Sequence, residues 1–201
     1  MTASPIGILL AAGRGRRFDP DGRRNKLLQH LPGAGNTGDT VVAASARKLL
    51  AALPAVVAVV PPGDGGVAAH LAALGCRVTV CPQADSGMAA SLTHAIRHSL
   101  HDATLAAPPD AWLVALGDMP FVLPATLIAL RDALLAGAGI AAPVLDGRRG
   151  NPVGFGSVHL PALLALQGDQ GARRLLQTCP VTEVAVPDAG ILRDIDTPAD
   201  L

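Results

Sequence analysis

Short, uninterrupted runs of apolar residues limit most strongly what this chain can fold into. Three of them are residues 6–12 (IGILLAA), 55–60 (AVVAVV) and 111–116 (AWLVAL). A strand that is covered on one face alternates apolar and polar residues, whereas a strand buried on both faces reads as a continuous apolar run. Because helices cover both faces of parallel sheets, these runs predict an α/β protein.

Amphipathic stretches separate these runs and indicate helices between the strands. We expect a Rossmann-like three-layer sandwich with a mainly parallel central sheet, formed by one domain over residues 1–201. Asp39 is the expected N-cap of the first long helix. Residues 147–156 are expected to form a hairpin or an irregular strand. The remaining strands are expected at 77–81, 140–144 and 181–186, and the helices at 40–53, 67–74, 88–100, 124–135, 160–166 and 172–177.

Composition excludes several classes of protein. Lys+Arg and Asp+Glu both number 16, so the formal net charge is zero, which argues against nucleic acid as a partner. No apolar run approaches the roughly 20 residues of a membrane span, and no basic segment precedes the first run as in a signal peptide. Cys76, Cys81 and Cys179 are odd in number and lack zinc-site spacing, which favours free thiols and a cytoplasmic location.

A glycine- and arginine-rich loop follows the first apolar run. Small side chains and successive backbone N–H groups suit the close approach of an anion, and Arg17 adds positive charge for a triphosphate. Neither the P-loop nor the G-x-G-x-x-G spacing is present, and a solvated basic turn is the alternative. The residues expected to bind a nucleotide here are Leu10, Ala11, Ala12, Gly13, Arg14, Gly15 and Lys26.

Asp118 directly follows the strand expected at 111–116, within the sequence GDMP. Ligands of doubly wound sheets bind at the carboxyl ends of the strands, and Mg²⁺ prefers carboxylate and phosphate oxygens. Asp118 lies too far before Pro124 to cap the next helix. We therefore expect Asp118 to hold Mg²⁺.

A third polar segment joins the strand expected at 77–81 to the following helix. The start of that helix offers unpaired N–H groups to an anion or to the edge of a base. An ordinary loop with Ser86 as the cap is the alternative. The candidate residues are Gln83, Ser86, Gly87 and Ser91.

Together these segments resemble the molybdenum-cofactor nucleotidyltransferases, a family of NTP transferases. The resemblance rests on LLAAGRGRRF with NKLL, then GMAASL and GDMP, and it continues through RRGNPVGFG, GDQGARRLL and DIDTPADL. It runs from near Ile6 to Leu201 with the motifs in the family's order. Within this group the chain is most similar to the CTP:molybdopterin cytidylyltransferases.

The resemblance implies a fold of the nucleotide-diphospho-sugar transferase type and a Mg²⁺-dependent transfer of CMP from CTP to molybdopterin. It implies catalytic roles for Arg17 and Lys26 on the phosphates and for Asp118 on Mg²⁺. It also suggests Asp196 as a second metal carboxylate, with Asn151 and Pro152 bordering the acceptor. A molybdoenzyme or its chaperone would be a further partner.

Two features refine this interpretation. Members that use GTP carry Gly-Gly where this chain has Ala12-Gly13, and the extra methyl narrows the space for a purine, which favours CTP. Residues 19–25 lengthen the link to Lys26, so Arg23 or Arg24 could share its role. The alternatives are a related transferase that acts on a sugar phosphate or another small phosphate, and a non-catalytic cofactor carrier.

Overall fold

The computed structural model describes residues 5–21, 23–32, 39–105, 107–168 and 171–201. Within them, eight strands form one sheet in the order β3-β2-β1-β4-β7-β5-β6, and β8 also pairs with β5. Strands β3, β2, β1 and β4 are parallel to one another, whereas β7 is antiparallel to both of its neighbours, β4 and β5. The strands are β1 (Ile6–Leu10), β2 (Val56–Val60), β3 (Arg77–Val80), β4 (Ala111–Leu116), β5 (Ile140–Leu145), β6 (Arg148–Arg149), β7 (Val153–Gly156) and β8 (Thr182–Ala185).

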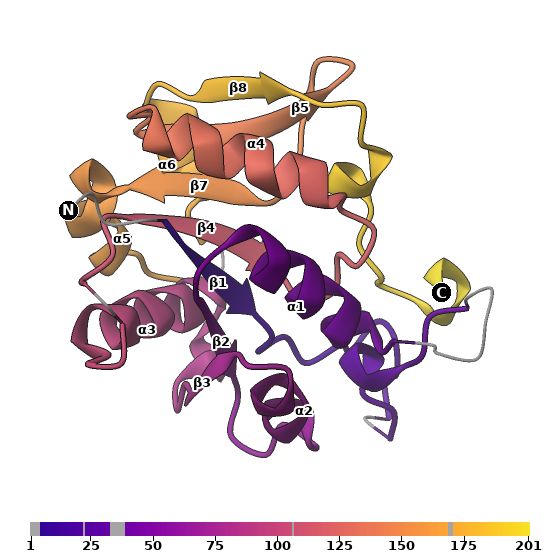
Figure 1. Ribbon diagram of the computed structural model, residues 1–201. Coiled ribbons are helices and arrows are strands. Elements are labelled where there is room, and N and C mark those ends of the chain that lie inside the picture. The colour runs from indigo at the N-terminus through magenta and orange to yellow at the C-terminus, as the bar shows by residue number, and fades with distance from the viewer. Residues whose placement is uncertain (1–4, 22, 33–38, 106, 169–170) are drawn as a thin grey trace.

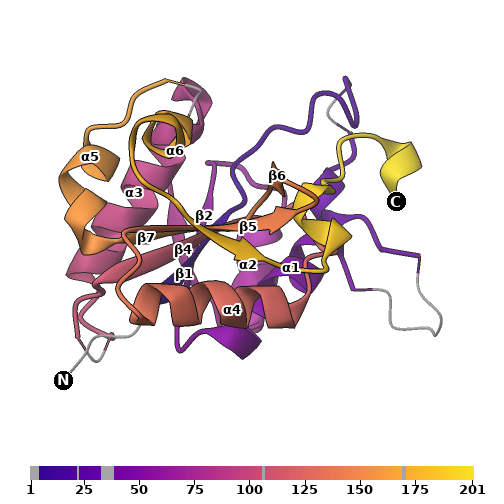
Figure 2. The same cartoon turned by 90° about the horizontal axis from the view of Figure 1, so that it is seen from above.

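Helices cover both faces of the sheet and confirm the expected three layers. In Figures 1 and 2, α1, α2 and α4 lie on one face, and α3, α5 and α6 lie on the other. The helices are α1 (Val41–Ala52), α2 (Val67–Ala73), α3 (Met88–His101), α4 (Pro124–Leu135), α5 (Leu160–Leu164) and α6 (Arg173–Thr178). Short 3-10 turns are η1 (Lys26–Leu28), η2 (Ala84–Ser86), η3 (Ser157–His159), η4 (Ala189–Leu192) and η5 (Pro198–Asp200).

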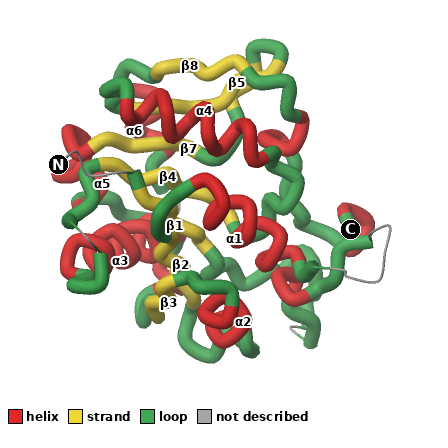
Figure 3. The backbone as a smooth tube through the Cα atoms, in the orientation of Figure 1, coloured by secondary structure: helices red, strands yellow, loops and turns green. Residues whose placement is uncertain are grey.

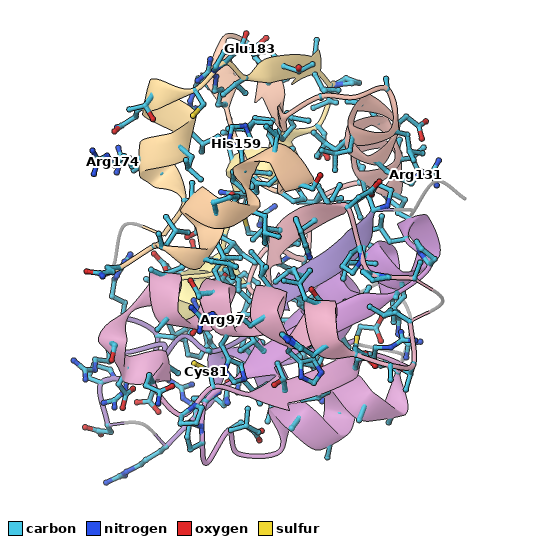
Figure 4. The ribbon with its side chains drawn as sticks, turned by 90° about the vertical axis from the view of Figure 1, so that its left-hand side faces the viewer. Cys81, Arg97, Arg131, His159, Arg174 and Glu183 are labelled. Carbon is cyan, nitrogen blue, oxygen red and sulfur yellow. The ribbon has the colours of Figure 1, made fainter. Side chains whose placement is uncertain are left out.

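The core is divided between the two faces because successive strand residues point to opposite sides. On β1, Ile8 packs in the cluster beneath α3 and α5, whereas Leu9 packs in the cluster beneath α1 and α4. Both residues are fully buried, and each contributes about 1.5–3 kcal/mol to folding. The apolar runs therefore form strands buried on both faces, as their composition predicts. In Figure 4, Cys81, which directly follows β3, and Glu183 on β8 lie toward opposite edges of the sheet.

The first long helix corrects one prediction. Thr40, not Asp39, is the N-cap of α1, and its side-chain oxygen accepts a hydrogen bond from the Ala43 backbone N–H at 3.3 Å. Asp39 instead forms an ion pair with Arg47, with 3.1 Å between Oδ1 and Nε. Both residue types can cap a helix, so the register of the chain entering α1 decides between them.

The carboxyl ends of β1 and β4 lie side by side, and this positions the candidate site. Leu10 is paired with Leu116 at the ends of the two strands, and the Gly117 N–H donates to the Leu10 carbonyl at 2.9 Å. Added to Gly117, a Cβ would lie 3.1 Å from that carbonyl oxygen, so the close approach favours glycine. Figure 3 shows long loops at this edge of the sheet, near the C-terminus.

Candidate active site

A cavity of about 560 Å³ opens at the carboxyl edge of the sheet. Its walls come from the loop after β1, the start of α3 and the end of β4, which are the three segments that the sequence singles out. A cavity of this size suits a small-molecule ligand. It is lined by Leu10, Ala12, Gly13, Arg14, Arg16, Ala84, Asp85, Gly87, Met88, Ser91, Leu116 and Asp118.

Five residues that we expected to bind a nucleotide are not among these lining residues; Lys26, which contacts carboxylates instead, is described below. The Ala11 side chain is buried in the core at 3% exposure. Gly15 adopts a positive φ of 58°, and its carbonyl accepts from the backbone N–H groups of Phe18 and Asp19, so it shapes the loop. Gln83 and Ser86 flank the lining residues Ala84 and Asp85 and are exposed.

Sequence reasoning missed several residues of the wall. Asp85 lies between Gln83 and Ser86, which we expected to bind a nucleotide, but no motif in the sequence indicates a role for Asp85 itself. It hydrogen-bonds to Arg14, 71 residues away, across the mouth of the cavity. The other lining residues that were not expected are Arg16, Ala84, Met88 and Leu116.

The Arg14–Asp85 pair is exposed and sets the electrostatics of this wall. The hydrogen bond from Arg14 is the largest cause that lowers the pKa of Asp85 from its ordinary value of 3.8, and the same contact raises the pKa of Arg14. More than half of each side chain is accessible to solvent. Exposed pairs contribute little to stability, so a phosphate could replace Asp85 as the partner of Arg14 at low cost.

The start of α3 is formed without a side-chain cap. Gly87 is the N-cap of α3, with a positive φ of 113°, so Ser86 does not cap this helix. A glycine here leaves space beside the first N–H groups of the helix, and both Gly87 and Ser91 line the cavity. This arrangement can accept an anion or the polar edge of a base.

Three carboxylates converge beside the cavity. One oxygen from each of Asp118, Asp194 and Asp196 lies within 4.8 Å of the others, the only such group of three among the described residues. Asp118 also lines the cavity, so the two features are continuous. Carboxylate oxygens are the ligands that Mg²⁺ and similar hard cations prefer, so this donor set fits a divalent metal.

Asp194 was missed by the sequence analysis, although a signal for it is present. In an extended segment, alternate side chains point to the same side. Ile195 is fully buried, while Asp194 and Asp196 on either side of it are exposed or partly exposed. The Ile195 N–H donates to the backbone carbonyl of Asp118 at 2.9 Å. This bond brings the segment beside the loop between β4 and α4, residues 117–123, which we call the Asp118 loop.

Lys26 contacts these carboxylates directly. Its Nζ lies 2.6 Å from Asp118 Oδ2 and 3.6 Å from Asp196 Oδ1, and it donates to the Ile195 carbonyl at 3.0 Å. Arg17 forms an ion pair with Asp196. Lys26 is 7% exposed, so its charge is compensated by the acidic cluster. Neither Lys26 nor Arg17 is among the residues that line the cavity.

Side chains of the segment before Lys26 form hydrogen bonds and ring contacts within that segment. Asp19 accepts hydrogen bonds from the backbone N–H groups of Asp21 at 3.2 Å and Arg24 at 2.6 Å. The Arg24 guanidinium lies 5.7 Å from the centre of the Phe18 ring. Within the described part of this segment, Lys26 therefore reaches the carboxylates, while Arg24 lies against Phe18.

Asn151 and Pro152 lie away from the cavity wall. Pro152 is buried and faces a small internal space shared with Lys48 and Val122. The Asn151 N–H donates to the Ile191 carbonyl at 2.9 Å, so it joins β7 to the C-terminal segment. Neither residue is among those that line the large cavity.

The match to a family model decides what kind of protein this is. Residues 7–184 match the MobA-like NTP transferase domain. The chain belongs to this family. The MobA-like match covers the loop after β1, the start of α3 and Asp118, but it ends before Asp194 and Asp196. Members of this family are nucleotidyltransferases, which use an NTP and a phosphate-bearing acceptor.

Solved structures of similar chains agree with this family. The structure of Rv0371c from Mycobacterium tuberculosis H37Rv has 30% identity and a TM-score of 0.79, covering 98% of this chain and 95% of that one. A manganese complex of Rv0371C, at 28% identity and a TM-score of 0.74, covers the same shares of the two chains. A nucleotidyl transferase from Methanothermobacter thermautotroptrophicus has 26% identity and a TM-score of 0.76, covering 98% and 94%.

A more distant structure shares the fold of this MobA-like chain. Molybdopterin-guanine dinucleotide biosynthesis protein A from Archaeoglobus fulgidus has 20% identity and a TM-score of 0.66, covering 96% of this chain and 93% of that one. No curated protein matches the chain in sequence. None of the described helices has both the length and the apolar character that crossing a membrane requires.

Proposed function

We propose that this nucleotidyltransferase transfers CMP from CTP to a molybdopterin-type acceptor, with Mg²⁺ as the metal. The observation that carries the proposal is the continuity of the 560 Å³ cavity with the three carboxylates through Asp118. A nucleotide in this cavity would have its phosphates beside the cations of the loop after β1 and beside the acidic cluster. The manganese complex of the similar Rv0371C supports a divalent metal in this fold.

The choice of CTP rests on Ala12. Ala12 lines the cavity. A methyl group there would leave less space for a purine than the glycine of family members that use GTP. One methyl group in a pocket changes discrimination by about 1–3 kcal/mol, so a pyrimidine preference of roughly tenfold or more is expected. The start of α3, with Gly87 and Ser91, would contact the base.

The chemistry needs positioning and charge neutralisation more than proton transfer. An oxygen of the acceptor phosphate attacks the α-phosphorus of CTP, and the new P–O bond replaces the bond to the β-phosphate, so pyrophosphate leaves. A phosphate nucleophile is already ionised near pH 7, so no general base is required. When bound, the metal would neutralise developing charge on the phosphate oxygens.

The residues of the chain supply the remaining functions. Asp118, Asp194 and Asp196 would hold the metal. Lys26 and Arg17, which contact these carboxylates, would turn to the phosphates of the bound nucleotide. Arg14 would leave Asp85 for the same phosphates. These cations would orient the α-phosphorus and stabilise the charge that develops during transfer.

A thermal-shift experiment tests nucleotide and metal together. CTP, GTP, ATP and UTP are each added with and without Mg²⁺. A ligand at 100 times its Kd stabilises the folded protein by about 2.7 kcal/mol, which is readily measured. The largest shift is expected for CTP with Mg²⁺. A larger shift with GTP would overturn the assignment of the base but retain the transferase.

A transfer assay tests the acceptor. The protein is incubated with CTP, Mg²⁺ and molybdopterin, and pyrophosphate release and the dinucleotide product are measured. A sugar 1-phosphate in place of molybdopterin is the matched control. Release with the sugar phosphate alone would assign the chain to the related transferases, and binding of molybdopterin without release would indicate a carrier.

A further inference from the structure

A buried carboxylate outside the candidate site joins two of its parts. Asp188 is 2% exposed and accepts three hydrogen bonds. Its Oδ2 accepts from the Leu123 N–H at 2.8 Å and from Thr126 Oγ1 at 2.6 Å, and its Oδ1 accepts from the Gly190 N–H at 2.9 Å. A buried carboxylate destabilises the folded state unless its oxygens accept hydrogen bonds. An apolar residue would fill the same volume without this requirement, so the presence of Asp188 requires another explanation.

The two oxygens of Asp188 face different parts of the molecule. Leu123 and Thr126 lie where the Asp118 loop ends and α4 begins. Gly190 belongs to η4, in the C-terminal segment that leads to Asp194 and Asp196. One carboxylate therefore links the loop that carries the first metal ligand to the segment that carries the other two.

Helix α1 also forms hydrogen bonds with the Asp118 loop. The Ser45 hydroxyl donates to the Gly117 carbonyl at 3.1 Å, and Lys48 Nζ donates to the Pro120 carbonyl. Burial, the larger effect, lowers the pKa of Lys48, and the nearby Asp188 carboxylate raises it. The Asp118 loop is therefore bonded near its start, middle and end.

The C-terminal segment packs against this loop without free space. A Cβ added to Gly190 would lie 2.3 Å from the Phe121 carbonyl oxygen, too close for any other residue without a backbone shift. Farther along, the Ile195 N–H bonds to the Asp118 carbonyl at 2.9 Å. The segment is thus bonded to the loop at Asp188 and at Ile195, on either side of Asp194.

We propose that Asp188 is a positioning residue that sets the register between the Asp118 loop and the Asp194–Asp196 segment, and so the geometry of the metal site. This inference rests on the proposed divalent-metal site. Asp188 contacts neither the cavity nor the carboxylate cluster, so it acts through the backbone. Supporting groups behind metal ligands typically change metal affinity 10- to 100-fold when they are lost.

Asp188→Asn tests the link on the C-terminal side. With its one carbonyl oxygen toward Leu123 and Thr126, the asparagine places an NH₂ group against the Gly190 N–H, so that bond is lost. Thr126→Val is the matched control, because it removes one hydrogen bond from the same carboxylate and leaves the bond to Gly190. Mn²⁺ affinity is measured by electron paramagnetic resonance on the full chain without nucleotide, well below each variant's Tm.

We expect Asp188→Asn to bind Mn²⁺ about tenfold more weakly than wild type, and Thr126→Val to stay within about twofold of wild type. Equal losses in both variants would mean that Asp188 is only structural and would overturn the inference. Wild-type affinity in Asp188→Asn would overturn it as well. If the wild-type protein itself bound no Mn²⁺, the metal site in the proposed function would fail, and the inference with it.

A second variant tests the register without altering Asp188. One glycine is inserted between Leu192 and Arg193, which lengthens the chain between the two contact points at a partly exposed position. We expect weaker Mn²⁺ binding, again by about tenfold, measured well below the Tm of this variant. Unchanged Mn²⁺ affinity would show that the spacing from Asp188 to the carboxylates is not important, and would overturn the inference.

Discussion

The two walls of the candidate site are built differently. The wall proposed to bind the nucleotide (the nucleotide wall) is formed by the loop after β1 and the start of α3, which the exposed ion pair between Arg14 and Asp85 joins. The carboxylate wall has a buried Lys26, bonded to Asp118, and a C-terminal segment packed tightly against the Asp118 loop. An exposed pair exchanges partners easily, whereas a buried cation does so only if another charge, here the proposed metal, compensates the carboxylates that it leaves. The first wall is suited to adapt to a ligand, and the second to hold a metal at a fixed geometry.

The largest effect is expected from the carboxylate wall. Asp118→Asn keeps the shape of the side chain but removes the charge that would hold the metal, so we expect transfer to fall at least about 100-fold. Asp110→Asn, at the opposite end of β4, is the matched control and should retain activity. Steady-state pyrophosphate release measures both, with circular dichroism to verify folding. Near-normal turnover of Asp118→Asn would remove Asp118 from the metal site.

Lys26→Met tests whether this wall depends on its buried cation. Loss of the ammonium leaves Asp118 without its cation beside Asp196, which keeps only its pair with Arg17, so we expect the free energy of unfolding to fall by about 3 kcal/mol. Saturating Mn²⁺ should recover much of this loss, since the ion would replace the missing charge. Urea unfolding with and without Mn²⁺ measures it. Lys48→Met, which loses a contact to a carbonyl instead, should gain no such recovery, and equal recovery in both variants would contradict the interpretation.

Selection of CTP over GTP tests the role proposed for the nucleotide wall. Ala12→Gly removes the methyl group that we propose narrows the cavity for a purine, so we expect the ratio of kcat/KM for CTP over GTP to fall about tenfold. Ala11→Gly makes the same change at the neighbouring residue, whose side chain lies in the core. It should lower stability but leave the ratio unchanged. If neither variant alters the ratio, Ala12 does not select the base.

The smallest effect concerns the ion pair across the mouth of the cavity. Because Arg14 lowers the pKa of Asp85, the pair stabilises the folded state above the ordinary carboxyl pKa of 3.8, and this contribution is lost as pH falls through the lower folded-state value. Since both groups are exposed, Arg14→Ala should leave Tm at pH 7 unchanged. The pKa of Asp85, followed by carbon-13 NMR, should return toward 3.8. Saturating CTP should produce a similar rise if Arg14 turns to the phosphates, and no rise would argue against that movement.

Much of the fold could be predicted from the sequence because it is encoded locally. The apolar runs identify the strands, and β4 and α4 begin and end at the expected residues. Parallel strands place their carboxyl ends at one edge, so the adjacency of the loop after β1 and Asp118 also follows from the sequence pattern. The family, too, is recognisable from the order of its motifs.

Contacts between distant segments could not be predicted in the same way. Arg17 meets Asp196 across 179 residues of sequence, and Lys26 meets Asp118 across 92. The sequence predicts a phosphate role for both cations, but it does not show the carboxylates that they contact in the structure. The choice of Thr40 over Asp39 as N-cap, and the insertion of antiparallel β7 between β4 and β5, likewise depend on how the chain returns to the sheet.

The sequence by itself determined which segments become strands, helices and polar loops, because burial pattern and helix signals are properties of neighbouring residues. Only the tertiary structure decided that Asp194 joins Asp118 and Asp196, that Lys26 lies among them, and that Asp188 bonds the two segments that carry these carboxylates. The physical reason is that each of these contacts requires a buried polar group to find its partner in space. That partner is set by the packing of the whole sheet and the C-terminal segment.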